Sequence, residues 1–212
     1  MQNKDGIVFV ISGPSGSGKG TVVEALRKIY PNAGVSVSAT SRTPREGEKE
    51  GVNYYYKTRE QFEALIENGE MLEYTQYNGN YYGTLKAEAE RIISSGKDLI
   101  LEIEVNGGAA VEKLMGDRCV LIMLIAPDSE ELERRLRGRG TDSDEVIAGR
   151  LDRAHAELAL APTYDYVVVN ESGEDVEKAA LVSAEKVLSI IKAEHMKSFR
   201  TAGYIKENFW QD

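Results

Sequence analysis

Residues 7–21 read Ile7-Val8-Phe9-Val10-Ile11-Ser12-Gly13-Pro14-Ser15-Gly16-Ser17-Gly18-Lys19-Gly20-Thr21, and a helix-forming stretch follows at 22–26. An apolar strand, a glycine-rich loop and a helix in this order form the phosphate cradle of nucleoside-triphosphate-binding proteins. Glycines let backbone N–H groups turn toward an anion at a helix N-terminus, and Lys19 can then reach the outer phosphates. A plain strand-to-helix turn rich in glycine is the alternative. We expect a nucleoside triphosphate to bind at Gly13, Ser15, Gly16, Ser17, Gly18, Lys19, Gly20 and Thr21.

One position departs from the general motif. A serine or threonine usually follows the lysine and holds Mg²⁺ through its hydroxyl, whereas this chain has Gly20 there and Thr21 one residue later. We therefore expect no strong direct protein ligand for Mg²⁺. Phosphate oxygens and water would hold the ion, with Thr21 or Glu104 assisting indirectly.

Composition narrows the possible partners. The formal net charge is −9, which disfavours binding to a nucleic acid polymer because that binding depends on neutralising phosphates. No apolar run approaches the roughly 18 residues of a membrane span, so no membrane partner is expected. The N-terminus leads straight into the first strand, which indicates no secretory signal. Cys119 is the single cysteine and fits the reducing cytoplasm, where we expect the protein.

Apolar runs alternate with helical patterns along the chain, which is typical of an α/β protein with a parallel sheet flanked by helices. We expect strands at 7–12, 35–40, 98–103, 120–126 and 166–170. Helices are expected from the loop to about residue 30, then at about 107–115, 128–137, 143–160 and 175–197. Asp128 with Glu131, and Thr58 with Gln61, predict helix N-caps.

The stretch from 38 to about 94 differs from the rest of the chain in its pattern of apolar residues. Its apolar segments are short and aromatic, and Asn78-Gly79 is a strong signal for a two-residue hairpin turn. These features predict a small antiparallel lobe inserted into the parallel core. A second irregular segment, 138–144, joins two arginine-bearing helical stretches, and glycines flanking an arginine there suggest a flap.

Six arginines fall between Arg134 and Arg153 in this acidic chain, which points to a small, discrete anion. Phosphoryl transfer needs in-line positioning and neutralisation of negative charge, and planar guanidinium groups match phosphate oxygens well. Arg135, Arg139 and Arg150 could bracket the transferred group. For Arg134, Arg137 and Arg153 we favour a solvated helix face.

A second cationic cluster lies at 38–45, where Arg42 and Arg45 stand three residues apart among hydroxyl side chains. This arrangement suits a mono- or dianionic phosphate, and the phenols of Tyr54 and Tyr82 can add donors to the same oxygens. Tyrosines in strands commonly serve as half-buried packing. We interpret the remaining tyrosines of the lobe in that way, namely Tyr55, Tyr56, Tyr74 and Tyr81.

Four motifs together resemble the guanylate kinase family over residues about 5 to 192. They are Gly13-Pro14-Ser15-Gly16-Ser17-Gly18-Lys19, Ser41-Arg42-Thr43-Pro44-Arg45-Glu46-Gly47-Glu48, Gly79-Asn80-Tyr81-Tyr82-Gly83-Thr84 and Arg135-Leu136-Arg137-Gly138-Arg139-Gly140-Thr141. The resemblance implies Mg²⁺-dependent transfer of the terminal phosphate of ATP to GMP, giving ADP and GDP in purine nucleotide metabolism, and use of dGMP is a further expectation. It also implies a parallel core (about 5–37, 95–137 and 151–192), a GMP-binding lobe (about 38–94) and an arginine-bearing lid (about 138–150).

Carried over position by position, the resemblance implies roles for individual residues. Lys19, Arg135, Arg139 and Arg150 match catalytic positions, and Asn170 matches a residue beside the adenine of ATP. GMP ligands are implied at Ser38, Arg42, Arg45, Tyr54, Glu73, Tyr82, Thr84 and Glu102. The segment Glu102-Ile103-Glu104-Val105-Asn106 departs from the family's usual aspartate and glutamine, so the reach of those side chains differs.

The chemistry of guanine supports the assignment of Glu73. Guanine presents N1–H and N2–H donors on one edge, which a single carboxylate accepts together, and a hydroxyl of Ser38 or Thr84 can donate to O6. Adenine offers an acceptor at N1 and would face the same carboxylate lone pair to lone pair. A kinase for another nucleoside monophosphate is therefore the weaker alternative.

A second alternative is a non-catalytic interaction module, because guanylate-kinase-like domains of scaffold proteins resemble this fold. Such domains typically lack a working phosphate loop and have companion domains, so Lys19 with its arginines favours the enzyme. A C-terminal extension at about 193–212 carries Phe199, Tyr204, Phe209 and Trp210. It could dock on its own domain, support a homo-oligomer, or fray. His155 and His195 lack metal-ligand spacing, and we interpret both as non-catalytic.

Overall fold

A five-stranded sheet lies at the centre of the structure, a computed structural model that describes residues 5–77, 79–138, 143–173 and 175–210. The strand order is β2-β7-β1-β8-β9, and every pairing in it is parallel. The strands are Ala33–Gly34 (β2), Asp98–Glu102 (β7), Val8–Ser12 (β1), Cys119–Ile125 (β8) and Tyr166–Val169 (β9). The predicted α/β fold with a parallel sheet is thereby confirmed.

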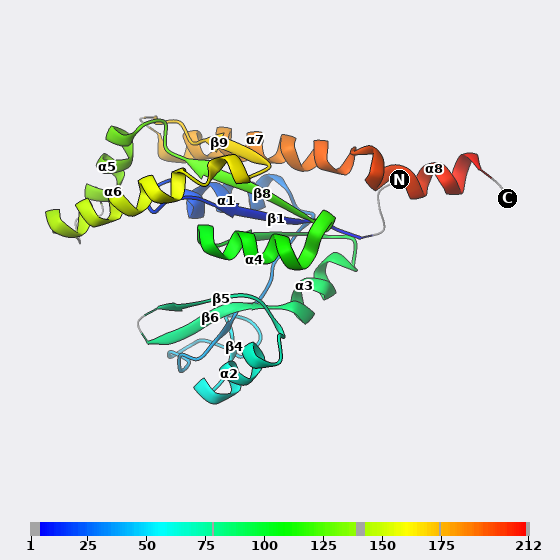
Figure 1. Ribbon diagram of the computed structural model, residues 1–212, viewed down its shortest axis with the longest axis horizontal. Helices are drawn as coiled ribbons and strands as arrows, with labels where there is room; N and C mark the ends of the chain where they lie inside the picture. The colour runs from blue at the N-terminus through cyan, green and yellow to red at the C-terminus, as the bar shows by residue number, and fades with distance from the viewer. Residues whose placement is uncertain (1–4, 78, 139–142, 174, 211–212) are drawn as a thin grey trace.

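Helices cover both faces of this sheet, which is why β1 and most of β7 and β8 are buried apolar runs. On one face Phe9 and Ile11 pack with α1 (Lys19–Ile29) and α7 (Val176–His195). On the other face Val8 and Val10 pack with α3 (Lys86–Ile93) and α4 (Val105–Met115). Figure 1 shows α7 and α4 on opposite sides of the sheet, so the carboxyl ends of the strands stay accessible at one edge.

Two further helices form a small cluster beside the sheet. Leu132 and Leu136 of α5 (Ser129–Arg137) pack against Ile147 and Ala154 of α6 (Asp144–Leu158). The predicted cap is confirmed, because the Asp128 side chain accepts a hydrogen bond from the Glu131 N–H and so begins α5. Two 3₁₀ turns serve as connections: η1 (Gly116–Arg118) leads from α4 into β8, and η2 (Ala161–Thr163) leads from α6 into β9.

The second sheet has four strands in the order β4-β3-β6-β5, and it lies apart from the first in Figure 1. Its strands are Ala39–Thr40 (β3), Tyr55–Tyr56 (β4), Met71–Tyr77 (β5) and Asn80–Leu85 (β6). Helix α2 (Arg59–Glu67) packs on it through Phe62 and begins at the predicted Thr58–Gln61 capping box. The expectation of a purely antiparallel lobe is wrong, because β3 pairs with β4 in parallel. Asn78 of the predicted turn lies outside the described residues.

The predicted strand at 35–40 is also wrong. Residues 35–38 belong to no strand: β2, which pairs with β7 in the core, ends before them at Gly34, and β3, which pairs with β6 in the lobe, takes up only Ala39–Thr40. The chain must cross between the sheets here, and Val35 is correspondingly 56% exposed. The other core strands and helices begin and end within a few residues of their expected bounds. The lobe, lid and core boundaries remain predictions, and α3 packs on the core although it lies within 38–94.

The C-terminal extension forms a helix, α8 (Ser198–Phe209), which Figure 1 shows running on from α7 beyond the sheet. Its first turn docks on the body, because Arg200 is buried 3.5 Å from the buried carboxylate of Glu194. Phe199, Phe209 and Trp210 are more than half exposed. None of the described helices is both long enough and apolar enough to cross a bilayer.

The end of α7 is fastened to the amino end of the sheet. Buried Asp98 accepts a hydrogen bond of 2.8 Å from the Ile7 N–H and one of 2.6 Å from the Tyr30 hydroxyl, and its Oδ2 lies 2.8 Å from Nε2 of His195. Burial raises the pKa of Tyr30 to about 12, so its phenol remains a donor at neutral pH. This places His195 in a structural network at the edge opposite the phosphate loop.

Candidate functional site

The glycine-rich loop joins the carboxyl end of β1 to the N-terminus of α1. Gly13, Gly16 and Gly18 have φ of 145°, 90° and 89°, a region that side chains with a Cβ avoid. Gly18 also lies where a Cβ would come within 2.4 Å of Nδ2 of Asn170. The Lys19 ammonium folds back over the loop and donates to the carbonyls of Gly13 and Pro14, at 2.5 and 3.0 Å. The loop therefore has the backbone and the charge that an anion at a helix N-terminus requires.

Residues that are distant in the sequence fix this loop through hydrogen bonds. The side chain of Asn170, which follows β9, donates from Nδ2 to the Ser17 carbonyl at 2.9 Å. The hydroxyl of fully buried Ser183 on α7 donates to Oδ1 of Asn170 at 2.8 Å. Both polar atoms of the Asn170 amide are thus used by the protein itself. Ser183 fixes which way the amide faces, and the amide fixes the loop; the sequence analysis did not single out Ser183.

The resemblance given above implies ATP at this loop and a phosphate acceptor elsewhere, and on that expectation Ser183→Ala should weaken the use of ATP more than that of the acceptor. The substitution leaves Oδ1 of Asn170 buried without its donor, at a cost of about 1–3 kcal/mol. The amide can then turn away from Ser17, so the KM for ATP rises while the KM for the phosphate acceptor stays within about twofold. Ser189→Ala, an exposed serine on the same helix, is the matched control. Equal changes in both KM values would remove Ser183 from this role.

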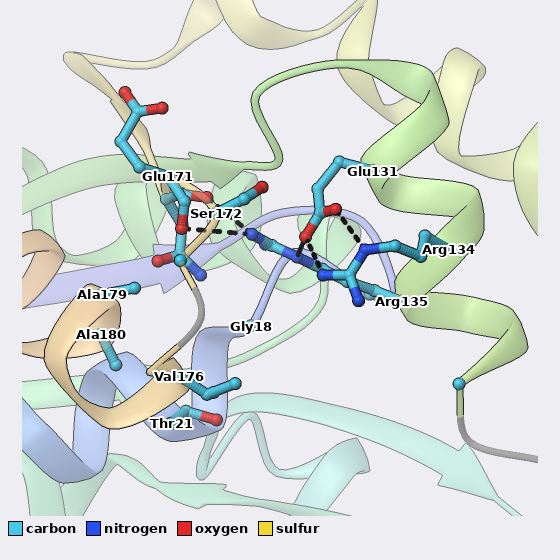
Figure 2. Close-up of a pocket in the computed structure, with 14 residues that line it drawn as sticks. Gly18, Thr21, Glu131, Arg134, Arg135, Glu171, Ser172, Val176, Ala179 and Ala180 are labelled. Atoms are coloured by element: carbon cyan, nitrogen blue, oxygen red, sulfur yellow. Dashed lines mark hydrogen bonds and ion pairs between the residues drawn. The ribbon is translucent and has the colours of Figure 1, made fainter.

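A cavity of about 350 Å³ opens beside the loop, between α5 and α7. Its lining includes Gly18, Arg135, Asn170, Val176 and Ala179, an apolar wall with polar groups at one side. Figure 2 shows Glu131 reaching both neighbouring arginines at this cavity. The size and the lining suit a planar base held next to bound phosphates.

Arg135 is fixed in the wall of this cavity. Its Nε donates to Glu131 at 2.7 Å, Nη1 to the Ser17 carbonyl at 3.3 Å and Nη2 to the Asn170 carbonyl at 2.9 Å. Hydrogen bonds from Arg134 and Arg135 lower the pKa of Glu131 to about 2, so this carboxylate stays charged at neutral pH. The structure therefore places Arg135 against the back of the loop, together with Asn170.

The other predicted arginines fall into two groups. Arg150 of α6 lies with Nη1 at 3.5 Å from the Ser15 hydroxyl, so it meets the loop, whereas Arg139 lies outside the described residues. The solvated face predicted for the remaining three is confirmed, because their side chains are 49–68% exposed and each pairs with a glutamate. They are Arg134, Arg137 and Arg153.

The predicted phosphate ligands of the lobe come together around Arg42. Its guanidinium carbon lies 5.5 Å from the ring centre of Tyr54, and the Tyr54 and Tyr82 rings meet edge to face at 6.1 Å. Arg45 is exposed at the tip of the same loop. Tyr81 stacks on Phe62, as expected of a packing residue. Tyr56 is half-buried and packs edge to face on Tyr54 at 5.9 Å, as expected. Its hydroxyl in addition donates to Glu48 at 2.8 Å, beside Arg42.

Glu73 and Thr84 face each other across the β5–β6 ladder. Burial raises the pKa of the Glu73 carboxyl above its ordinary value, and a hydrogen bond from the Thr84 hydroxyl opposes that shift. Within the described part of the chain no cation forms an ion pair with Glu73. The ionised form of such a half-buried carboxylate is stabilised by a ligand whose N–H groups donate hydrogen bonds to it. Ser38 lies half-buried directly before β3, on the neighbouring part of the lobe.

Oxygen ligands for a hard cation are sparse near the loop. The Glu102 carboxylate at the end of β7 lies 3.5 Å from where a Cβ of Gly20 would stand, so it faces the position that the motif's hydroxyl usually occupies. Thr21 is exposed on the first turn of α1, and Glu104 pairs with Arg153 at 3.0 Å. The described residues contain no group of three His, Cys, Asp or Glu suited to a metal. Glu102 and Thr21 fit an ion whose other ligands are phosphate oxygens and water.

These features define a class of protein. A phosphate loop at the carboxyl end of a central parallel strand, met by Arg135 and Arg150 and flanked by a base-sized cavity, belongs to nucleotide-binding P-loop phosphotransferases.

Comparisons with known proteins identify the particular family. The family model described as guanylate kinase matches residues 6–193. A guanylate kinase of Halalkalibacterium halodurans is 46% identical over 200 residues, covering 94% of each chain, and one of Lactococcus lactis is 48% identical over 192 residues, covering 91% of this chain and 90% of that one. The crystal structure of guanylate kinase from Anaplasma phagocytophilum superposes with a TM-score of 0.70 at 32% identity, covering 100% and 99% of the two chains. The chain belongs to the guanylate kinase family and is a nucleoside monophosphate kinase.

Proposed function

We propose that this enzyme transfers the terminal phosphoryl group of ATP to GMP, giving ADP and GDP, and that it also accepts dGMP. The observation that carries the proposal is the Glu73–Thr84 pair of the lobe, a half-buried carboxylate with a neighbouring hydroxyl. Guanine alone among the common bases presents two adjacent N–H donors and an acceptor to such a pair. The reaction belongs to purine nucleotide metabolism, and buried Cys119 as the sole cysteine fits a cytoplasmic setting.

The residues of the chain would divide the work between two phosphate sites. The loop N–H groups and Lys19 hold the phosphates of ATP, and the cavity lined by Arg135 and Asn170 takes its adenine. Arg42, Arg45, Tyr54 and Tyr82 hold the phosphate of GMP. That phosphate is already a nucleophile, so no side chain needs to act as a strong general base. Catalysis then rests on in-line positioning and on Lys19, Arg135, Arg139 and Arg150 stabilising the transferred group.

We further propose that the reaction requires Mg²⁺. When bound, the ion neutralises charge on the β- and γ-phosphates during transfer. With Gly20 in the loop, phosphate oxygens and water supply most of its ligands, and Thr21, Glu104 and the nearby Glu102 carboxylate assist. Glu104 does so in competition with its ion pair to Arg153.

The test is the formation of ADP from ATP and Mg²⁺ with GMP, dGMP, AMP and UMP offered separately. We expect turnover with GMP and dGMP and nearly none with AMP or UMP, since a site of buried polar partners can reject the wrong base by about 10⁴-fold. Turnover of a different monophosphate would retain the fold and overturn the assignment of guanine. Binding of GMP without any transfer would instead indicate an interaction module.

A further inference from the structure

The Glu48 carboxylate lies at the centre of the lobe's loop that carries Arg42 and Arg45. Its Oε1 and Oε2 accept from Nη2 of Arg42 at 2.9 and 3.0 Å. Oε2 also accepts from the backbone N–H of Arg45 at 2.7 Å and from the Tyr56 hydroxyl at 2.8 Å. One carboxylate thus joins both arginine positions to strand β4. Neither Glu48 nor Tyr56 has a part in the site proposed above.

These contacts fix the orientation of the Arg42 guanidinium. Nη2 is held by Glu48, and Nη1 donates to the Thr43 carbonyl at 2.7 Å. The same group lies over the Tyr54 and Tyr56 rings, at 5.5 and 6.0 Å from their centres. A free arginine side chain has many rotamers, and ordering it on binding costs free energy. Here that ordering is complete before any ligand arrives.

We propose that Glu48, itself held by Tyr56, is a positioning residue that orients Arg42 toward the phosphate of the nucleoside monophosphate. The inference rests on the proposed function, because it assumes that Arg42 binds that phosphate.

A carboxylate beside an arginine could instead compete with the phosphate, and the contacts of Glu48 argue against this. Two of its donors, the Arg45 N–H and the Tyr56 hydroxyl, anchor the carboxylate independently of Arg42, and its side chain is only 19% exposed. The hydrogen bond from Arg42 lowers the pKa of Glu48 to about 2, so the pair stays ionised at neutral pH. Since Arg42 is paired with Glu48, exposed Arg45 is the arginine that offers its positive charge to the phosphate. Arg42 then supplies an oriented hydrogen-bond donor to the phosphate, and Arg45 supplies positive charge.

The test is Glu48→Gln, which keeps the shape of the side chain and removes its charge. We expect the KM for GMP to rise about 10- to 100-fold, the range that follows from losing hydrogen bonds to a charged group, while the KM for ATP changes by less than about twofold. Glu46→Gln makes the same change on an exposed side chain of the same loop and serves as the control. In equilibrium titrations of the Glu48→Gln protein, GMP binding should weaken while guanosine, which lacks the phosphate, binds as it does to the parent.

Tyr56→Phe provides a second, milder variant that removes only the hydroxyl. It should raise the KM for GMP by a smaller factor, and in the Glu48→Gln background it should have almost no further effect, because both changes act through the same carboxylate. An unchanged KM for GMP in both single variants overturns the inference, as does tighter GMP binding, which would mean that Glu48 competes with the phosphate. Equal losses for GMP and guanosine overturn it too, since they would indicate general damage to the lobe. The parent protein separates the two proposals: if it fails to phosphorylate GMP, the proposed function fails before any variant is compared.

Discussion

Replacing Lys19 by methionine is expected to lower kcat by about 10³-fold, with the fold retained. Lys19 is the cation of the phosphate loop, and its ammonium already lies over the loop at the Gly13 and Pro14 carbonyls. On transfer it would move to the oxygens of the phosphoryl group, where negative charge develops. Removing one donor preorganised for such charge costs about 3–4 kcal/mol. Methionine keeps the length and the apolar stem but offers neither charge nor donor.

The measurement is steady-state turnover with saturating ATP and GMP, supported by the thermal unfolding of each protein. Lys28→Met is the matched control, because Lys28 lies on the same helix, is 69% exposed and pairs with exposed Glu24 at 3.0 Å. Its turnover should equal that of the parent. A Lys19→Met protein that retains turnover within tenfold of the parent would remove Lys19 from its assigned role.

Replacing Glu73 by glutamine is expected to raise the KM for GMP by about 100-fold while leaving the KM for ATP nearly unchanged. The amide presents N–H₂ where guanine also presents N–H groups, so one donor faces another and both lose their partners. Breaking hydrogen bonds to a charged group in this way costs about 1.5–3 kcal/mol. Glu67→Gln, an exposed carboxylate at the end of α2, provides the control. Equal effects on both KM values would show that Glu73 does not contact the base.

The same site gives a pH dependence with a defined sign. Burial raises the pKa of the Glu73 carboxyl, so its protonated form is populated at a higher pH than that of an exposed glutamate. Only the ionised carboxylate accepts both guanine donors. The KM for GMP should therefore rise as the pH falls toward the raised pKa, and Glu73→Gln should abolish that dependence.

The parts of the structure that sequence predicts well are set by local patterns. The strand–loop–helix at 7–26, the caps at Thr58 and Asp128 and the paired strands β5 and β6 each depend on residues a few positions apart. The strand predicted at 35–40 was wrong because the structure of this segment depends on distant pairing partners and not on a local pattern. Its residues suit a strand throughout, but the chain crosses here from β2 in one sheet to β3 in the other, so residues 35–38 pair with neither sheet.

The candidate site likewise contains residues that local motifs predict and residues whose roles depend on distant contacts. Arg42, Tyr54, Tyr82, Glu73 and Thr84 could be assigned from motifs, and the structure brings them together in the lobe. Asn170 was assigned to the ATP site, but its hydrogen bond to Ser17 was not predicted, because the two residues stand 153 positions apart. Ser183 was missed because it carries no motif of its own. For Glu48 a signal was available: a carboxylate three residues after Arg45 can accept from that residue's N–H, as Gln61 does at Thr58.

The phosphate loop occupies the first tenth of the chain, yet the groups that hold it come from its second half. The Ser17 carbonyl has its donors only after Arg135 and Asn170 have been synthesised. The Asn170 amide is in turn oriented only after Ser183 has been synthesised. During synthesis on the ribosome, the N-terminal end emerges first, and β1 must remain without β7 and β8 until residues 98–125 follow. A nascent chain halted before Arg135 would therefore carry the full loop sequence without any of these groups, and one halted before Ser183 would still lack the hydroxyl that orients Asn170. The exposed apolar strand β1 would be a natural substrate for chaperones, and nucleotide would gain a folded site to bind only once translation is almost complete.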